Sequence, residues 1–445
     1  MSTASGDPNV AKQPAGLEPS STKALHPGAK EGQRILGLVL IGAAMGIPAS
    51  VAAWAFLQIV HWLENLLWTD LPDALGHSSP PWYLILGLPI CGAAVVALAR
   101  AFLPGDGGHS PLLGIGGPPT PWQYAPSVLL AAVGTLAFGM VLGPEGPLIA
   151  IGSAVGMIVV SMTKLPGPAE GVMANAGSFS AVSALFGGPL VAGVLLLESG
   201  LAAGAALLPA LLPGLTAAAV GYVIFIGLGN WSGLGSAGLS VPELPHYEHT
   251  RILDLVLAIV VGIVAAIVMR VIKSIANRID DKAETPNSKQ KYGVLFLGAI
   301  AVGVITLIAQ ALGATHDEIL FSGQSAVPDV LAETSIGILL LIIVAKGLAY
   351  AICMGAGFRG GPVFPAILIG VTLATIGCVM FGSSITWAVA VGAAAGMTAG
   401  TGLVFSSLTL ALLLTGSPGI DALPAAVLAV VAAWLTKAIL SERQN

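Results

Sequence analysis

Long apolar runs separated by short polar or glycine- and proline-rich breaks fill residues 35–440 of the chain. Runs such as 252–275 are long enough to cross a bilayer, which takes about 20 apolar residues in a helix. Others, such as 189–197, are too short to cross, and broken helices of this kind occur where they are buried in protein or line a cavity. The pattern predicts an all-α polytopic membrane protein with broken and re-entrant helices.

Composition supports this class. Of the 445 residues, 56% are hydrophobic and only 9% are charged, whereas soluble domains carry roughly 25% charged residues. The 58 glycines and 30 prolines suit closely packed, interrupted membrane helices. Cys91, Cys353 and Cys378 lie in apolar segments without metal-site spacing, so we expect no disulfide framework, no metal site and no cofactor.

The ends and loops of the chain predict its orientation. Residues 1–34 are polar and lack apolar periodicity, so we expect a disordered tail. Basic residues precede the first span, cluster within residues 270–291 and follow the last span. By the positive-inside rule all three places are cytoplasmic. We therefore predict a multi-pass protein of the plasma membrane with a cytoplasmic amino-terminal tail and a cytoplasmic carboxyl terminus.

The motif Gly143-Pro144-Glu145-Gly146-Pro147 places a carboxylate between helix breakers inside an apolar region. An ionised glutamate in hydrocarbon is costly, so Glu145 should face protein or a water-filled cavity and take part in moving something charged. We expect one helix to stop at Gly143 and another to start near Pro147. A helix start at membrane depth offers unpaired amides to an anion. The plain structural alternative is a kink with a glutamate at a loop tip.

The second half of the chain repeats this break. Gly361-Pro362-Val363-Phe364-Pro365 begins 218 residues after Gly143, and at the same offset Gly152 matches Gly370. Paired interruptions in two halves point to a midplane binding site in a transporter. We predict one membrane domain of two half-repeats, 35–240 and 250–440. If they are inverted, both helix starts aim at one central point, where amides hold a small anion loosely enough to release it.

At four places the sequence resembles the CLC family of chloride channels and chloride/proton exchangers. The blocks are residues 143–147, 355–365, 105–111 and 189–199. The resemblance implies that Glu145 is the gate and that Glu198 lies near the proton path. It also implies anion binding by Gly146, Val363 and Phe364, and a homodimer with one pathway per subunit. Leu63-Glu64-Asn65-Leu66-Leu67-Trp68 and the run before Gly361 are similar to a divergent bacterial branch of ion-transport proteins.

The chain also departs from the family pattern. Pro144 replaces the basic residue before the gate, which should weaken anion attraction there. Either Gly107 or Ser110 takes the place of the family's central serine, depending on how the loop aligns. Ser199 stands where exchangers carry their proton-transfer glutamate, so either Glu198 substitutes or coupling is weak or lost. A tyrosine contacts the central anion in much of the family, but none follows Tyr350.

Four other polar residues have two interpretations each. Lys346, deep in an apolar run, either faces the anion vestibule or snorkels near a helix end. Arg359 either attracts anions or caps a helix end. His109 either titrates beside the anion path or has no role. Asp106 either faces the pore, where it would repel anions, or binds backbone amides as a turn residue, which we favour.

We therefore predict transport of chloride or a similar small anion through a pathway gated by Glu145, with H⁺ exchange left open. One alternative is an uncoupled chloride channel or a fluoride-selective transporter. Another is a non-conducting structural or signalling membrane protein. The partners expected are the anion, protons, the lipid bilayer and a second copy of the chain, with no nucleic acid. No zinc-protease helix or Gly-x-Ser-x-Gly motif stands out, so we do not expect an enzyme.

Overall fold

The fold is helical throughout the part of the chain that the computed structural model describes. The described residues are 29–115, 118–163, 168–199, 207–232, 241–283 and 288–442. In these ranges the only β pairing is an isolated bridge between Gly143 and Gly361. The predicted all-α class is confirmed.

The elements of the first part of the chain are α1 (Ala29–Asn65), η2 (Leu66–Asp70), α2 (Leu71–Ala74), α3 (Trp82–Phe102), η3 (Pro111–Leu113), η4 (Trp122–Tyr124), α4 (Ala125–Leu136), α5 (Glu145–Thr163), α6 (Pro168–Leu185), α7 (Pro189–Glu198) and α8 (Leu207–Ser232). Those of the second part are α9 (Ile252–Ala283), α10 (Ser288–Ala311), α11 (His316–Ile319), α12 (Val327–Ala332), α13 (Ile336–Gly355), α14 (Val363–Phe381), α15 (Ile385–Thr401), α16 (Phe405–Thr415), η6 (Ser417–Ala422) and α17 (Leu423–Glu442).

Nine helices within the described ranges are long and apolar enough to cross a membrane. Three others, α7, α15 and α16, are apolar but short. This confirms the predicted multi-pass membrane protein with broken helices. Helix α1 begins at Ala29, so residues 29–34 are helical, whereas we expected them to belong to the tail. The rest of that predicted tail, residues 1–28, lies outside the described ranges.

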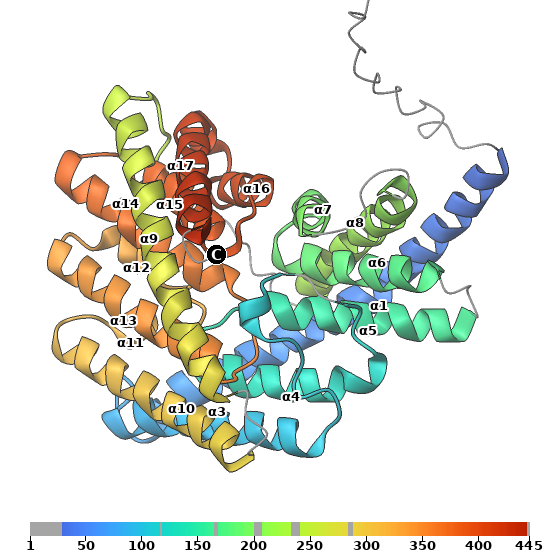
Figure 1. The fold of residues 1–445 in the computed structure, drawn as a ribbon, viewed down its shortest axis with the longest axis horizontal. Helices are drawn as coiled ribbons and strands as arrows, with labels where there is room; N and C mark the ends of the chain where they lie inside the picture. Colours follow the sequence, from blue (N-terminus) through green and yellow to red (C-terminus); the bar gives the residue numbers. More distant parts are fainter. Residues whose placement is uncertain are drawn as a thin grey trace, which may run out of the picture.

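Most helices of each part of the chain gather together. Figure 1 shows α9 and α13 to α17 on one side and α5 to α8, with α1, on the other. Helix α1 packs against α8, α6 and α5, while α9 packs against α17, α13 and α15. Helices α3 and α10 cross this division, because α10 packs against both α3 and α13.

Glycines set the closest helix contacts in both parts. Gly152 of α5 lies against Gly177 of α6, and Gly370 of α14 lies against Gly392 of α15, with no room for a Cβ at any of the four. Small residues let membrane helices approach closely. Because Gly152 and Gly370 are a pair at the 218-residue offset, the sequence repeat extends to helix packing.

Helix α9 shows why the outer surface suits a bilayer. Many of its large side chains, such as Val256 and Ile267, are exposed, whereas small residues such as Ala258, Gly262 and Ala265 face inward. Gly262 packs directly on the backbone of Ala429 in α17. Lipid solvates aliphatic side chains, so small residues inside and large ones outside give close helix contacts without an exposure cost.

Candidate functional site

The helix break before Glu145 is wider than the sequence predicted. Helix α4 ends at Leu136 and α5 begins at Glu145, whereas we expected an end at Gly143 and a start near Pro147. Gly139 adopts a positive φ of 83°, which favours glycine and ends the helix early. The indole of Trp68 donates to the carbonyl of Ala137, at 3.1 Å, and so holds a freed backbone group.

The two repeated motifs meet each other at this break. The amide of Gly143 donates to the carbonyl of Gly361 at 2.8 Å, and the amide of Gly361 donates back at 2.6 Å. Helix α14 begins at Val363, directly after this bridge, and α5 begins at Glu145. Both helix amino termini, with their unpaired amides and positive dipole ends, therefore start from one shared point.

The Glu145 carboxylate occupies this point. Its side chain is fully buried, and Oε1 accepts a hydrogen bond from the amide of Val363. The amide of Phe364 also interacts with the carboxylate. Among the described residues Oε2 has no hydrogen-bond partner. The protein thus binds the carboxyl group of its own glutamate through backbone amides at a helix start.

Glycines make the space for this side chain. A Cβ at Gly143 or at Gly361 would collide with the Glu145 carboxylate. Gly146 lies close to Gly360, whose carbonyl oxygen would be 3.1 Å from an added Cβ. The glycines of both motifs are therefore needed for the backbones and the carboxylate to come this close.

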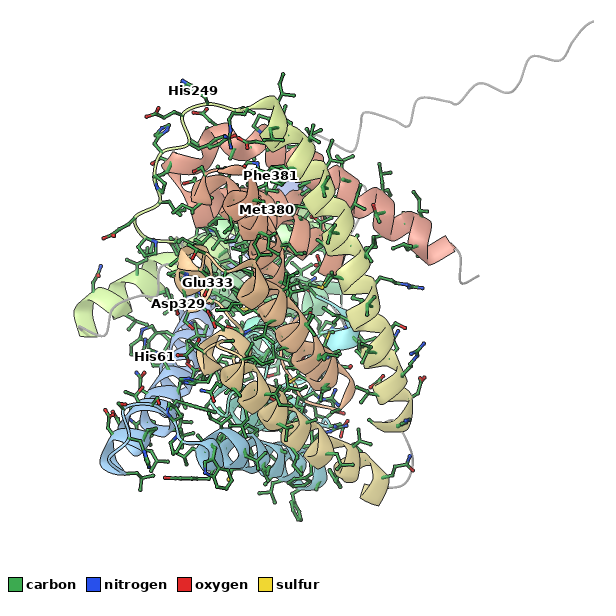
Figure 2. The ribbon with its side chains drawn as sticks, turned by 90° about the vertical axis from the view of Figure 1, so that its left-hand side faces the viewer. His61, His249, Asp329, Glu333, Met380 and Phe381 are labelled. Atoms are coloured by element: carbon green, nitrogen blue, oxygen red, sulfur yellow. The ribbon has the colours of Figure 1, made fainter. Side chains whose placement is uncertain are left out.

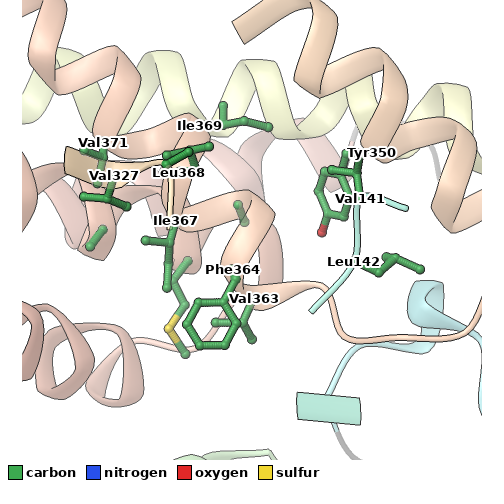
Figure 3. Close-up of a cluster of buried hydrophobic side chains, with 14 of the residues drawn as sticks. Val141, Leu142, Val327, Tyr350, Val363, Phe364, Ile367, Leu368, Ile369 and Val371 are labelled. Carbon is green, nitrogen blue, oxygen red and sulfur yellow. The ribbon is translucent and has the colours of Figure 1, made fainter. Parts of the chain in front are cut away.

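Tyr350 belongs to this site, although the sequence interpretation gave it no role. Its buried hydroxyl donates to the carbonyl of Pro362 at 2.7 Å, immediately before the amide that holds Glu145. Figure 3 shows Tyr350 beside the chain at Val141 and Leu142. The one available signal was a hydroxyl in the largely aliphatic run of α13, since a buried hydroxyl needs a partner.

Two separate cavities reach the chain on either side of Glu145 in sequence. The Pro144 cavity, about 370 Å³, is bounded by Pro144, Leu142 and residues of α1, α6 and α8. The Gly146 cavity, about 320 Å³, is bounded by Gly146, Pro362 and the loop before α4. They share no lining residue, and Glu145 lines neither. The two sequence neighbours of the buried Glu145 therefore line different cavities.

A third cavity adjoins the Pro144 cavity. The Phe364 cavity, about 510 Å³, is lined by Phe364 and Ile367 of α14 and by the segment between α11 and α12. It shares His61, Glu64, Ser322 and Gln324 with the Pro144 cavity. The Phe364 ring stacks on Phe186 with centroids 5.7 Å apart. The two cavities therefore lie against the same four residues, one near the start of α5 and the other near the start of α14.

The loop after α3 brings His109 to the Gly146 cavity, and neither Gly107 nor Ser110 lines it. The amide of Gly107 donates to the Ser127 hydroxyl at 2.9 Å, and the Ser110 hydroxyl caps η3. Burial, together with the nearby charge of Arg359, lowers the pKa of His109. Both effects favour the neutral form of its imidazole.

Asp106 binds cations, not the backbone amides that we favoured. Its carboxylate accepts from Arg100 (2.9 and 3.0 Å), Lys291 (2.6 Å) and Arg359 (2.8 Å). Burial raises the pKa of Asp106, but the hydrogen bonds from Arg100 and Lys291 outweigh it and bring the pKa down to about 2. Arg359 is thereby ion-paired, and we interpret it as an anchor for the segment before α14.

The carboxylate of Glu198 caps α16. It accepts from the amides of Val404 (2.6 Å), Phe405 (3.1 Å) and Ser406 (2.8 Å), and from the Ser406 hydroxyl (2.7 Å). Ser199, the next residue, lines the Gly146 cavity, whereas Glu198 does not. Ser199 therefore faces the Gly146 cavity, and the Glu198 carboxylate is held by the start of α16.

Lys346 fits neither interpretation offered from the sequence. Its side chain is fully buried in α13, so it does not snorkel, and it lines none of the three cavities described above. The amine donates to the carbonyls of Leu320 (2.8 Å) and Phe321 (3.3 Å). It lies behind Gly323, where an added Cβ would come within 2.9 Å of Nζ. Lys346 thus holds the segment that forms one wall of the Phe364 cavity.

Solved structures with a similar fold include a slow cyanobacterial Cl⁻/H⁺ antiporter, with a TM-score of 0.71 and 19% identity, covering 92% of this chain and 97% of that one. A CLC-type fluoride/proton antiporter matches with a TM-score of 0.69 and 21% identity, covering 93% and 98%. At these identities the likeness shows a shared fold.

Sequence relatives include the "Putative ion-transport protein YfeO" of Shigella boydii serotype 4 (strain Sb227) and of Escherichia coli (strain K12 / DH10B). Each is 27% identical, over 366 and 359 residues respectively, covering 78% of this chain and 80% of the relative. The family model described as "Voltage gated chloride channel" matches residues 110–437. Because this match covers well over half of the chain, the protein belongs to the CLC family of voltage-gated chloride channels.

Proposed function

We propose that this chain carries chloride or a similar small anion across the bilayer along a path that Glu145 opens and closes. One observation carries the proposal. The buried Glu145 carboxylate accepts from a backbone amide where the starts of α5 and α14 meet, and its two sequence neighbours line different cavities. A permeating anion needs the same donors. Departure of the carboxylate frees them and joins the Pro144 cavity to the Gly146 cavity.

Electrostatics link this movement to protons. A carboxylate and a halide carry the same charge, and two like charges repel strongly in a poorly solvated site. Protonation removes the negative charge of Glu145 and, with it, the attraction to the Val363 amide. The neutral side chain then yields its place to the anion. Acid should therefore favour anion flux.

The similar proteins support an anion as the cargo. One structural neighbour is described as a Cl⁻/H⁺ antiporter and another as a fluoride/proton antiporter. The start of α14 presents the backbone amides of Val363 and Phe364, which do not distinguish one halide from another by charge. We therefore keep chloride and fluoride both as candidate cargo.

Replacing Glu145 by Gln tests the gate. The variant keeps the side-chain volume but removes the titrating charge, so we expect roughly tenfold or more anion flux at neutral pH and loss of the acid activation that Glu145 causes. The measurement is anion efflux from liposomes that hold purified protein. Glu170→Gln, an exposed site in the first turn of α6, is the matched control. Flux that is flat in wild type and variant alike would favour the non-conducting alternative.

An uncoupled pathway is the second candidate, because Glu198 is held in four hydrogen bonds by the start of α16. A carboxylate whose charged form is so well bound is a poor proton carrier. Recording external pH during efflux decides between the two modes. Protons driven uphill by an anion gradient would establish exchange, and anion flux without linked protons would establish a channel-like pathway.

We also propose a homodimer in the plasma membrane with both termini cytoplasmic. The family resemblance supports the dimer, and the placement of basic residues supports the orientation. Cross-linking in native membranes tests the first. Labelling of single cysteines placed at each end of the chain, from outside intact cells, tests the second.

A further inference from the structure

Glu64 is an ionisable side chain that the proposed gate does not use. It lies in the last turn of α1 and lines both the Pro144 cavity and the Phe364 cavity. Among the described residues it has no ion pair and no hydrogen-bond partner for its carboxylate. A partly buried carboxylate without partners is costly to ionise, so its charge responds readily to its surroundings.

Few other titratable groups lie around the chamber formed by the Pro144 and Phe364 cavities. His61, one turn earlier on α1, lines both cavities, and Asp317 of α11 lines the Phe364 cavity. Lys346 of α13 lies behind the wall at Gly323. The residues that α6 and α8 contribute to the Pro144 cavity are Ala184, Leu185 and Phe225, which carry no charge. The side chains of Glu64 and Asp317 thus face the chamber directly, whereas the buried amine of Lys346 does not.

This chamber is an unexpected place for acidic residues in an anion path. An ion that approaches Pro144 passes the wall formed by Glu64. Ionised Glu64 repels it over the width of a cavity, and protonated Glu64 does not. The cavity of about 370 Å³ is mostly apolar, but it is large enough to hold water and its wall includes the polar side chains of Gln58, Ser322 and Gln324, so Glu64 is able to exchange protons with the medium.

We propose that Glu64 is a second titrating carboxylate, distinct from Glu145, that controls the entry of anions into the Pro144 cavity. The inference rests on the proposed function, because it needs an anion path through that cavity. Glu145 would open the barrier between the chambers, while Glu64 would set how many anions reach it.

The test compares wild type, Glu64→Gln and Glu64→Asp by chloride efflux from liposomes between about pH 4 and about pH 9. Because a buried carboxylate without a partner is costly to ionise, Glu64→Gln should raise flux at the alkaline end of this range by about two- to tenfold, the range for removing one like charge from a watery chamber. Glu64→Asp keeps the charge and should behave like wild type. Asp329→Asn is the control, since this exposed acid of α12 lines none of the three cavities; Figure 2 shows it together with His61. A Glu64→Gln flux equal to wild type at every pH would overturn the proposal.

The Glu145→Gln background separates the two carboxylates. With the gate titration removed, a residual pH dependence should remain, and it should vanish in Glu145→Gln/Glu64→Gln. If the residual dependence persists in the double variant, Glu64 is not its source and the inference fails. If Glu145→Gln itself leaves flux unchanged, the proposed function fails instead.

A second test, by chemical modification of a cysteine, does not depend on how Glu64→Gln folds. Glu64→Cys is made with the exposed Cys91 changed to Ser, because Cys353 is buried and Cys378 is half-buried. A thiol reagent that adds a negative charge should lower flux several-fold, and a neutral reagent of similar size should not. Equal effects of both reagents would show that bulk, not charge, acts at this position.

Discussion

At the scale of single residues, the site depends on the absence of a Cβ at two glycines as much as on the Glu145 carboxylate. Glu145 reaches the Val363 amide because neither Gly143 nor Gly361 has a Cβ. Gly361 does not adopt a positive φ, so its backbone tolerates alanine. A small side chain there changes the position of the carboxylate without changing its chemistry.

Gly361→Ala should therefore mimic an open gate. The added methyl group collides with the end of the Glu145 side chain, which is flexible and moves away more easily than the backbone. We expect flux at neutral pH to rise several-fold, with the carboxylate still present. Liposome efflux measures the change, and Gly87→Ala, where an added Cβ meets nothing within 4 Å, is the control. A silent or fully inactive but folded variant would contradict this steric account.

Residue chemistry also explains which residues of the site could be predicted from the sequence. Glu145 was predictable because a lone acid in an apolar run has to be solvated by something. Tyr350 was not, since its partner is a backbone carbonyl 12 residues away, and no side-chain pattern reports that contact. The choice between Gly107 and Ser110 depended on loop geometry, and the structure brings their neighbour His109 to the cavity.

At the scale of elements, α7 and α16 are joined end to end by Glu198. The last residue of α7 supplies an acceptor for three amides at the start of α16, a helix of 11 residues. Val404, at the N-cap position of α16, offers no side-chain acceptor. The cap thus comes from another helix and fixes the angle between the two.

Glu198→Ala should destabilise the protein by about 0.5–2 kcal/mol, the usual cost of losing a helix cap. Glu198→Gln keeps an acceptor oxygen and should lose less. Melting temperatures in detergent provide the comparison, with Ser199→Ala as the neighbouring control. If Glu198→Ala has the same melting temperature as wild type, the cap contributes little to stability. If the variant instead abolishes proton-linked flux, Glu198 belongs to a proton path.

Element boundaries were harder to predict than element types. Apolar runs indicated helices correctly, because backbone groups in a bilayer have to pair within the helix. The end of α4 at Leu136 was missed, since Gly139 and the partners that hold residues 137–139, Trp68 and Phe321, lie in distant segments. Tertiary contacts, not the local Gly-Pro signal alone, decide where this helix stops.

At the scale of the whole molecule, Asp106 ties together segments that lie far apart in the chain. Its carboxylate joins the end of α3, the start of α10 and the loop between α13 and α14. Partners separated by 6, 185 and 253 residues leave no local pattern in the sequence. This is why the cluster could not be predicted, although Arg359 and the basic run that contains Lys291 were noted.

Asp106→Asn should lower stability in a way that depends on pH. The folded pKa of about 2 lies below the ordinary value of 3.8, so the ionised carboxylate stabilises the fold fully above about pH 3.8. That contribution is lost as pH falls from 3.8 towards 2, where the carboxyl becomes protonated in both states. The variant should therefore melt at a lower temperature than wild type near neutral pH, and the difference should shrink in acid. Asp73→Asn, an exposed acid in α2, is the control. A difference that stays constant down to about pH 2.5 would mean that Asp106 acts through packing and not through its charge.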